Sequence, residues 1–213
     1  GELSKALAMI NLAANCGCDY VKFQYYQVED MPDRDTGGNR AMYEKLQVPK
    51  SWLPQMFDYA RGDGVGLFAS VFSVRAVREL LQYDVPYIKI ASPESTGLDY
   101  KVIRDIVAEV PDDVQVIYSS RTQLHQKTLY CPFGHPPTIT HKDFKAFREG
   151  NFYGFSDHTP GIRTPLAFIR AGARMIEKHF KLEYDALKND NPSVDAAFSA
   201  DPFTMKTLCR LAH

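Results

Sequence analysis

The sequence predicts an α/β fold in which parallel strands alternate with helices. Short apolar runs of strand length alternate along the whole chain with amphipathic segments of helix length. The spacing of most strand–helix units is typical of a (β/α)8 barrel of the TIM type. The chain has 213 residues, fewer than the roughly 250 of a complete barrel, so we expect an incomplete one.

The individual elements follow from hydrophobic periodicity. The first helix is predicted over 3–15, because Leu3, Ala6, Leu7 and Ile10 lie on one apolar stripe. Runs rich in β-branched and aromatic residues predict the strands, and amphipathic segments predict the helices between them. The predicted strands cover 20–26, 65–72, 86–92, 114–120, 128–131, 152–158 and 174–180, and the later helices cover 52–61, 74–81, 100–110, 141–149, 162–171 and 202–212.

Two parts of a complete barrel are missing from this pattern. The chain begins directly in a helix, so a first strand would have to precede Gly1. Only 121–126 separate the fifth and sixth barrel strands, and six residues are too few for a parallel crossover, which needs about a dozen. We therefore expect a single partial barrel domain over 1–213 that lacks its first strand and the helix between strands five and six.

Composition excludes several classes of protein. Lysine and arginine (25) balance aspartate and glutamate (26) without a basic block, which argues against nucleic-acid binding. No apolar run is long enough to span a membrane. The four scattered cysteines, Cys16, Cys18, Cys131 and Cys209, are too few for a disulfide-rich scaffold, and a zinc module is the weaker interpretation. Buried free thiols in a cytoplasmic protein are expected instead.

Polar side chains gather at the carboxyl ends of the predicted strands, where (β/α)8 enzymes place their working residues. They are Lys22, Gln24, Ser70, Lys89, Ser92, Glu94, Ser119, Ser156, His158, Glu177 and His179. Alternation places Lys22 and Gln24 on one face of their strand, and Val21 and Phe23 on the other. Buried lysines require an anionic partner. That partner is either a phosphate or carboxylate ligand or a neighbouring acid such as Glu94 or Glu177.

Two histidines end consecutive strands. His158 and His179 could converge on one divalent metal, because imidazole with carboxylate support suits manganese, iron, cobalt or zinc. Each stands beside an acidic residue, Asp157 or Glu177. The alternative is that both are hydrogen-bonded core histidines, and the residue pattern leaves the two interpretations open.

Several motifs in order resemble the sialic acid synthases, which condense phosphoenolpyruvate with an N-acylated aminosugar. The central ones are Gly154-Phe-Ser-Asp-His-Thr-Pro-Gly161 and Ile176-Glu-Lys-His-Phe180. Supporting matches are Tyr20-Val-Lys-Phe-Gln24, Phe68-Ala-Ser-Val-Phe72, Tyr87-Ile-Lys-Ile-Ala-Ser92 with Glu94, and Ile117-Tyr-Ser-Ser120. Their order holds along the chain except around 121–135.

The resemblance implies a role for each matching residue. His158 and His179 are implied to bind a divalent metal, usually Mn²⁺, with Mg²⁺ or Co²⁺ as alternatives. Phosphoenolpyruvate is implied to bind Lys22, Ser70, Lys89, Ser92, Ser119 and Ser156, and the sugar to face Gln24, Asn39, Glu94 and Asp195. Asp190 competes with Asp195 for its role. Glu94 and Lys89 are the implied catalytic residues, and the resemblance also implies a homodimer.

The sequence departs from the family pattern at several places. An acidic residue of the first strand and a C-terminal antifreeze-like domain are not found in the chain. Arg121 stands where the family has glycine, and Phe133 and His135 loosely replace an asparagine and a tyrosine of the sugar-facing loop. These differences support a second hypothesis, a relative that binds metal and anion without turnover. A third hypothesis is a Schiff-base aldolase that uses Lys22 or Lys89.

Overall fold

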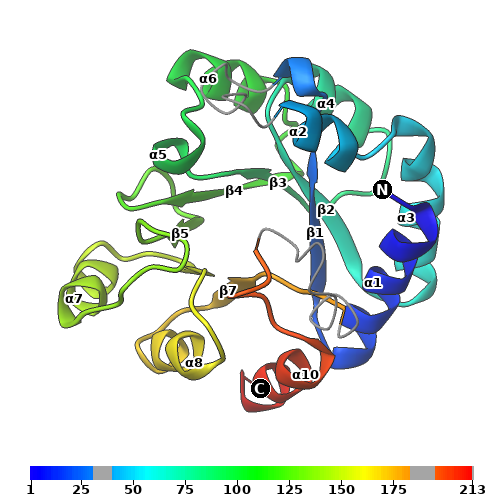
Figure 1. Cartoon of the computed structure of the whole chain (residues 1–213). Coiled ribbons are helices and arrows are strands. Elements are labelled where there is room, and N and C mark those ends of the chain that lie inside the picture. The colour runs from blue at the N-terminus through cyan, green and yellow to red at the C-terminus, as the bar shows by residue number, and fades with distance from the viewer. Residues whose placement is uncertain (31–39, 183–194, 213) are drawn as a thin grey trace. The chain divides into compact units, whose positions relative to one another are not determined.

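The computed structural model describes residues 1–30, 40–182 and 195–212, with the side chains of 94 and 95 excepted. The chain divides into two compact units. Unit 1 comprises Gly1–Ala14 and Asp19–Tyr118, and unit 2 comprises Asn15–Cys18 and Ser119–His213. Figure 1 shows the elements of both in chain order. No helix in the described ranges is both long and apolar enough to cross a membrane.

Unit 1 contains four strands in the order β1-β2-β3-β4, with every pairing parallel. Its strands are β1 (Tyr20–Tyr25), β2 (Gly66–Val71), β3 (Tyr87–Ile90) and β4 (Gln115–Ser120), the last of which ends in unit 2. Its helices are α1 (Leu3–Cys16), which also ends in unit 2, η1 (Val28–Asp30), α2 (Arg40–Leu46), η2 (Lys50–Trp52), α3 (Leu53–Gly62), α4 (Val74–Leu80), α5 (Pro93–Thr96) and α6 (Tyr100–Ala108).

An aliphatic core separates the strands of unit 1 from their covering helices. Ala69 and Ile88, which are register partners on β2 and β3, are fully buried with Val77 and Leu80 of α4. The remaining face of the same strands carries Ser70 and its partner Lys89. Alternation along the strands therefore directs apolar side chains to the helices and polar side chains to the opposite face. Val21 and Phe23 pack against this core as predicted.

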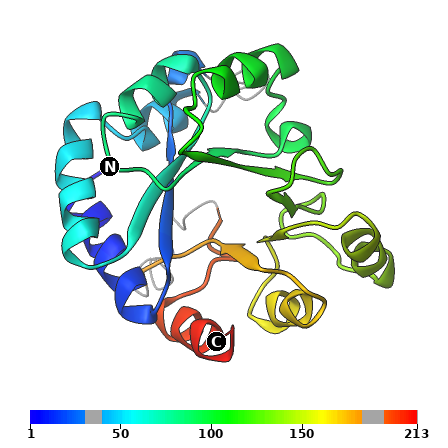
Figure 2. The ribbon, with the colours of Figure 1, turned by 180° about the vertical axis from the view of Figure 1, so that it is seen from behind.

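Unit 2 contains the parallel strands β5 (Thr128–Tyr130), β6 (Gly154–Asp157) and β7 (Met175–Lys178) in that order. Its helices are α7 (His141–Glu149), α8 (Arg163–Arg170) and α10 (Pro202–Ala212). Helix α8 packs on β6 and β7, and α10 packs on α8 (Figure 2). The core here is aromatic, because Phe155 of β6 stacks on Phe168 of α8 and Phe147 packs edge-on against Phe168.

Local sequence signals fix where helices begin. The side chains of Thr140 and Asp143 form a capping box at the start of α7, which satisfies two backbone N–H groups that the helix itself leaves without partners. Ser73 caps α4 through the N–H of Ala76, and Asp99 caps α6 through the N–H of Lys101. All three helices were predicted: the bounds of α7 agree with the prediction, and α4 and α6 end one and two residues earlier than predicted.

In a complete (β/α)8 barrel a helix would connect the fifth and sixth strands. In this chain a compact turn connects them instead. Residues 121–126 are all exposed and none is helical. The Thr128 hydroxyl oxygen accepts hydrogen bonds from the N–H groups of Leu124 and His125, and Cys131 N–H donates to the Ser120 carbonyl at 3.0 Å. The prediction that no helix lies between these two strands is thus confirmed. The short helices α2 and α5 were not predicted, because helices of one or two turns have too little periodicity to detect.

Candidate functional site

A lysine–serine pair joins the middle of β1 to the carboxyl end of β2 in unit 1. The ammonium Nζ of Lys22 donates a hydrogen bond to Ser70 Oγ at 3.3 Å. The parallel register brings Gln24 opposite Ser70, and Ser70 opposite Lys89 on β3. Four of the residues predicted from sequence are therefore carried by three adjacent strands of one unit.

Lys89 is the most buried cation of this group, with 1% of its surface exposed. Ser70 and Ser92 are also buried. Ser92 precedes α5 and its carbonyl accepts hydrogen bonds from both the N–H and the hydroxyl of Thr96, which fixes the turn that follows β3. An ammonium group surrounded by hydroxyls at strand ends is suited to an anionic ligand.

Three predicted or competing sugar-facing residues lie wholly or partly outside the described part of the structure. Glu94 belongs to the one-turn helix α5, directly after Ser92, but its side chain lies outside the described part of the structure. Asn39 and Asp190 lie outside the described residues altogether. Their predicted roles stay predictions.

The predicted serines of unit 2 are buried, as expected for positions that face the barrel interior. Ser119 and Ser156 are 3% and 2% exposed. Ser156 lies opposite Glu177 across β6 and β7, and its hydroxyl donates to Glu177 Oε1 at 3.0 Å. Glu177 therefore has a hydroxyl donor next to the predicted metal-binding histidines.

The two histidines predicted to bind a metal do lie together. His158 follows β6 and His179 follows β7, and their ring centroids are 5.1 Å apart. Phe198 contacts both rings, at centroid distances of 5.7 and 5.1 Å. A third imidazole, His135, packs edge-on against His158 at 4.4 Å. Sequence reasoning had placed His135 only loosely in the sugar-facing loop, and its contact with His158 is a feature of the folded chain.

Side chains contact the Nδ1 atom of each of these histidines. His179 Nδ1 is 3.4 Å from Asp195 Oδ2, and His158 Nδ1 is 4.0 Å from Cys131 Sγ. Asp195 is held by its own turn, because its carbonyl accepts hydrogen bonds from the N–H and the hydroxyl of Ser199. A carboxylate on one ring nitrogen of a histidine orients the other nitrogen, an arrangement common in metal sites.

The segment that carries Asp195 is joined to the end of β7. The N–H of Ala200 donates to the His179 carbonyl at 2.7 Å, and the N–H of Lys181 donates to the Ala200 carbonyl at 2.9 Å. These two bonds make a parallel bridge between Phe180 and Ala200. The contact between Asp195 and His179 thus rests on backbone pairing as well as on side chains.

Sequence reasoning missed a buried ion pair on the other face of β6 and β7. Lys178 Nζ is 2.8 Å from Asp157 Oδ2, and the two side chains are 1% and 0% exposed. The same ammonium group donates to the carbonyls of Thr159 and Phe198. The signal was available, since Asp157 and Lys178 each precede a predicted ligand and alternate with it along the strand.

No group of three or more histidine, cysteine, aspartate or glutamate side chains in the described ranges is arranged to hold a metal ion. His158 and His179 each carry imidazole nitrogens, a donor type that suits Mn²⁺ and similar metals.

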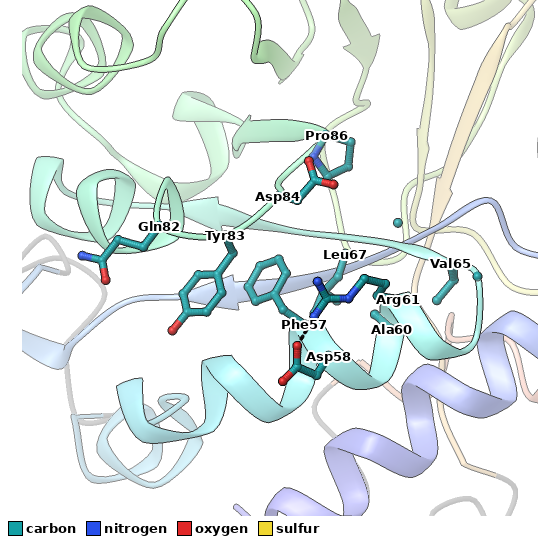
Figure 3. Close-up of a pocket in the computed structure, with 12 residues that line it drawn as sticks. Phe57, Asp58, Ala60, Arg61, Val65, Leu67, Gln82, Tyr83, Asp84 and Pro86 are labelled. Carbon is teal, nitrogen blue, oxygen red and sulfur yellow. Dashed lines mark hydrogen bonds and ion pairs between the residues drawn. The ribbon is translucent and has the colours of Figure 1, made fainter.

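A surface pocket of about 470 Å³ in unit 1 is lined by none of the predicted site residues (Figure 3). Val65, Gly66 and Pro86, at the beginnings of β2 and β3, form one side of it. Helix α3 forms the other side, where Arg61 forms an ion pair with Asp58. Barrel enzymes use the carboxyl ends of their strands, whereas this pocket lies at the amino ends of β2 and β3. We therefore do not assign it to the candidate site.

With this geometry established, comparison with known proteins identifies the family. The sequence profile of the NeuB family matches residues 9–120 and 140–213. The chain therefore belongs to the NeuB family. The unmatched stretch contains the turn that replaces a helix, so the structural departure and the sequence departure coincide.

Among its relatives is the spore coat polysaccharide biosynthesis protein SpsE of Bacillus subtilis, which is 27% identical over 98% of this chain and 62% of its own length. The N,N'-diacetyllegionaminic acid synthase of Campylobacter jejuni is 25% identical over 98% of this chain and 71% of its own length. The chain thus spans about two thirds of the length of the curated relatives it matches.

A solved structure shows the same fold. The N-acetylneuraminic acid synthetase of Leptospira borgpetersenii, determined in complex with citrate, aligns with a TM-score of 0.74 and 23% identity. The alignment covers 100% of this chain and 78% of that one. This likeness confirms the predicted fold class, an incomplete α/β fold of the (β/α)8 type.

Proposed function

We propose that this chain is the barrel part of an enzyme that condenses phosphoenolpyruvate with an N-acylated aminosugar, such as an N-acetylmannosamine-like sugar. The products are a nonulosonic acid and phosphate. The observation that carries the proposal is the pair of histidines after β6 and β7, with Asp195 at 3.4 Å from His179 Nδ1. Membership of the NeuB family, with relatives that include a legionaminic acid synthase, supports it.

The lysine–serine group of unit 1 supports an anionic substrate. Phosphoenolpyruvate carries a phosphate and a carboxylate, and Lys22, Ser70 and Lys89 offer two ammonium groups and a hydroxyl on adjacent strands. We assign these three residues, with Ser92, Ser119 and Ser156, to phosphoenolpyruvate. Charge-assisted hydrogen bonds of this kind are roughly twice as strong as neutral ones, which favours a doubly anionic ligand.

We assign His158 and His179 to a divalent metal, with Mn²⁺ first and Mg²⁺ or Co²⁺ as alternatives. When bound, such a metal polarises the aldehyde oxygen of the open-chain sugar. Asp195 Oδ2 lies 3.4 Å from His179 Nδ1, an arrangement that leaves the Nε2 atom of that ring for the metal. Phe198 packs against both imidazoles and limits their rotation.

The bond changes of the proposed reaction balance without a redox partner. The C3 carbon of phosphoenolpyruvate attacks the aldehyde carbon and forms the new C–C bond. Water adds at C2, where positive charge develops, and the C–O bond to phosphate breaks. Lys22 and Lys89 stabilise the phosphate and carboxylate charges and fix the direction of attack. Glu94, with Gln24, Asn39 and Asp195 on the sugar side, orients a sugar hydroxyl or the water and can transfer a proton.

The proposal is tested by incubating the purified chain with Mn²⁺, phosphoenolpyruvate and a panel of N-acylated mannosamine-type sugars. Phosphate release and product mass are followed. Sugar-dependent release is expected, and His179→Ala should lower it by at least about 100-fold. His141→Ala, which removes an exposed histidine at the start of α7, is the matched control and should release phosphate at the unaltered rate.

A second candidate function is supported by the unmatched stretch and the helix-less turn within it. In that case the chain binds Mn²⁺ and phosphoenolpyruvate without turnover. A folded sample that binds both ligands and releases no phosphate with any sugar would support this second function and contradict the first. Undiminished release by His179→Ala would also contradict the assignment of the metal.

A further inference from the structure

A pair of thiols in unit 2 lies close enough to react. Cys18 Sγ and Cys209 Sγ are 3.8 Å apart, although 191 positions separate the two residues in the sequence. Both side chains are partly exposed, whereas Cys16 and Cys131 are buried. The expectation that all four thiols are buried is therefore wrong for Cys18 and Cys209. None of the four cysteines forms a disulfide in this structure.

The backbone around the pair is held in place by packing on both sides. Cys209 lies on α10, whose Met205 and Leu208 belong to a buried cluster with Cys16, and Cys18 packs against the same cluster. Gly17 turns the chain between Cys16 and Cys18 with φ +91°, a conformation that side chains rarely adopt. The two thiols therefore meet because of a fixed turn and a packed helix.

We propose that Cys18 and Cys209 form a site of reversible oxidation, in which a peroxide converts the dithiol to an intramolecular disulfide. One thiolate attacks hydrogen peroxide, becomes a sulfenic acid and releases water. The second thiolate attacks that sulfur, forms the S–S bond and releases a second water. Two thiols and one peroxide thus give one disulfide and two waters. A disulfide S–S distance is about 2.05 Å, so the sulfurs approach each other by rotation of their side chains.

The third thiol of the cluster provides an internal control. Cys16 is buried and its Sγ donates to the Pro202 carbonyl at 3.2 Å. Burial, with a smaller contribution from Cys209, raises the pKa of Cys16 above its ordinary 9.0, so this group stays protonated at neutral pH. Because the thiolate is the reactive form, Cys16 should react more slowly than the partly exposed pair.

The experiment treats the whole folded chain with hydrogen peroxide, blocks the remaining thiols under denaturing conditions, and analyses the products by mass spectrometry and non-reducing gel. We expect the number of titratable thiols to fall from four to two, a linked peptide containing Cys18 and Cys209, and faster migration of the looped chain. Dithiothreitol should restore all four thiols. The Cys16→Ser/Cys131→Ser double variant should still form the link, whereas Cys18→Ser and Cys209→Ser should lose it.

Other products would overturn the proposal. A disulfide-linked dimer, a link between Cys16 and Cys18, or irreversible sulfinic acid without any link would each show that the pair does not close within one chain. Unchanged thiols after treatment would do the same. The double variant keeps the test decisive, because it removes the competing thiols and leaves the reacting pair intact. Far-ultraviolet circular dichroism of each variant verifies that the chain compared is folded.

Discussion

The two units differ in how they accommodate a buried lysine. In unit 2, Lys178 is held by the Asp157 carboxylate and by the carbonyls of Thr159 and Phe198, on the face of β6 and β7 that alternates with the histidines. In unit 1, Lys89 lies opposite Ser70 on the polar face of the strands, and Ser70 lies opposite Gln24. Burial of a lysine therefore does not by itself identify a ligand site. We propose that the face of the strand on which the lysine lies distinguishes the two roles.

This contrast predicts opposite outcomes for one kind of substitution. Lys178→Met leaves the Asp157 carboxylate buried without its cation, so the free energy of unfolding should fall by about 3–5 kcal/mol. Lys89→Met should abolish the thermal stabilisation that we expect phosphoenolpyruvate to give the wild-type chain. Denaturant unfolding and thermal shift with the ligand measure the two effects. Lys142→Met, at an exposed position, is the control.

The opposite assignment is also observable. If Lys89→Met unfolds the chain and Lys178→Met only weakens phosphoenolpyruvate binding, Lys89 is the structural lysine and the comparison is reversed.

The close packing of β6 against its neighbours predicts the next largest effect. A Cβ added at Gly154 would lie 2.2 Å from the Met175 carbonyl oxygen and 2.8 Å from Leu129 Cδ2. Because the nearest obstacle is backbone, Gly154→Ala should destabilise the chain by about 3 kcal/mol, the upper part of the range for overpacking. Gly62→Ala, where a Cβ meets nothing within 4 Å, is the matched control. Equal unfolding midpoints for the two variants would contradict the expectation.

The contact between Asp195 and His179 predicts a smaller effect, on metal binding. Asp195→Asn removes the charge that orients the imidazole, so Mn²⁺ affinity measured by titration calorimetry should fall about 10- to 100-fold. Asp112→Asn, at an exposed position in unit 1, should bind Mn²⁺ as the wild type does. Unchanged affinity in Asp195→Asn would assign this carboxylate to the sugar alone.

The smallest effect is predicted at the start of α7. Burial by itself would raise the pKa of Asp143, but hydrogen bonds from Thr140 N–H, the Tyr130 hydroxyl and the Thr140 hydroxyl outweigh it and hold the pKa below 3.8. A lowered folded-state pKa means that this stabilisation is present above pH 3.8 and is lost as the pH falls through the lowered value. Melting temperatures of wild type and Asp143→Asn should therefore converge in acid.

A constant difference between these two melting curves at every pH would show that Asp143 acts through packing or capping alone, without a contribution from its charge.

Much of this architecture follows from local sequence pattern, and the remainder depends on contacts between distant residues. Hydrophobic periodicity and runs of β-branched and aromatic residues predicted the strands and the longer helices. The pairing of His158 with His179 followed from their positions at the ends of consecutive strands. The ion pair of Asp157 with Lys178 was missed because Asp157 was considered only as an acidic neighbour of His158, whereas alternation directs it to the other face, where it pairs with Lys178. The approach of Cys18 to Cys209 depends on packing across 191 positions, which no local pattern contains.

The turn at 121–126 also determines where this chain can be opened. All six residues are exposed. The N–H groups of Leu124 and His125 donate hydrogen bonds to the Thr128 hydroxyl at the start of β5. Exposed backbone of this kind accepts proteolytic cuts and new chain ends. A cut within 121–126 would leave the polar side chains of β1 to β3 and the histidine pair on uninterrupted segments. The same turn therefore offers a natural point at which to divide the molecule for fragment complementation.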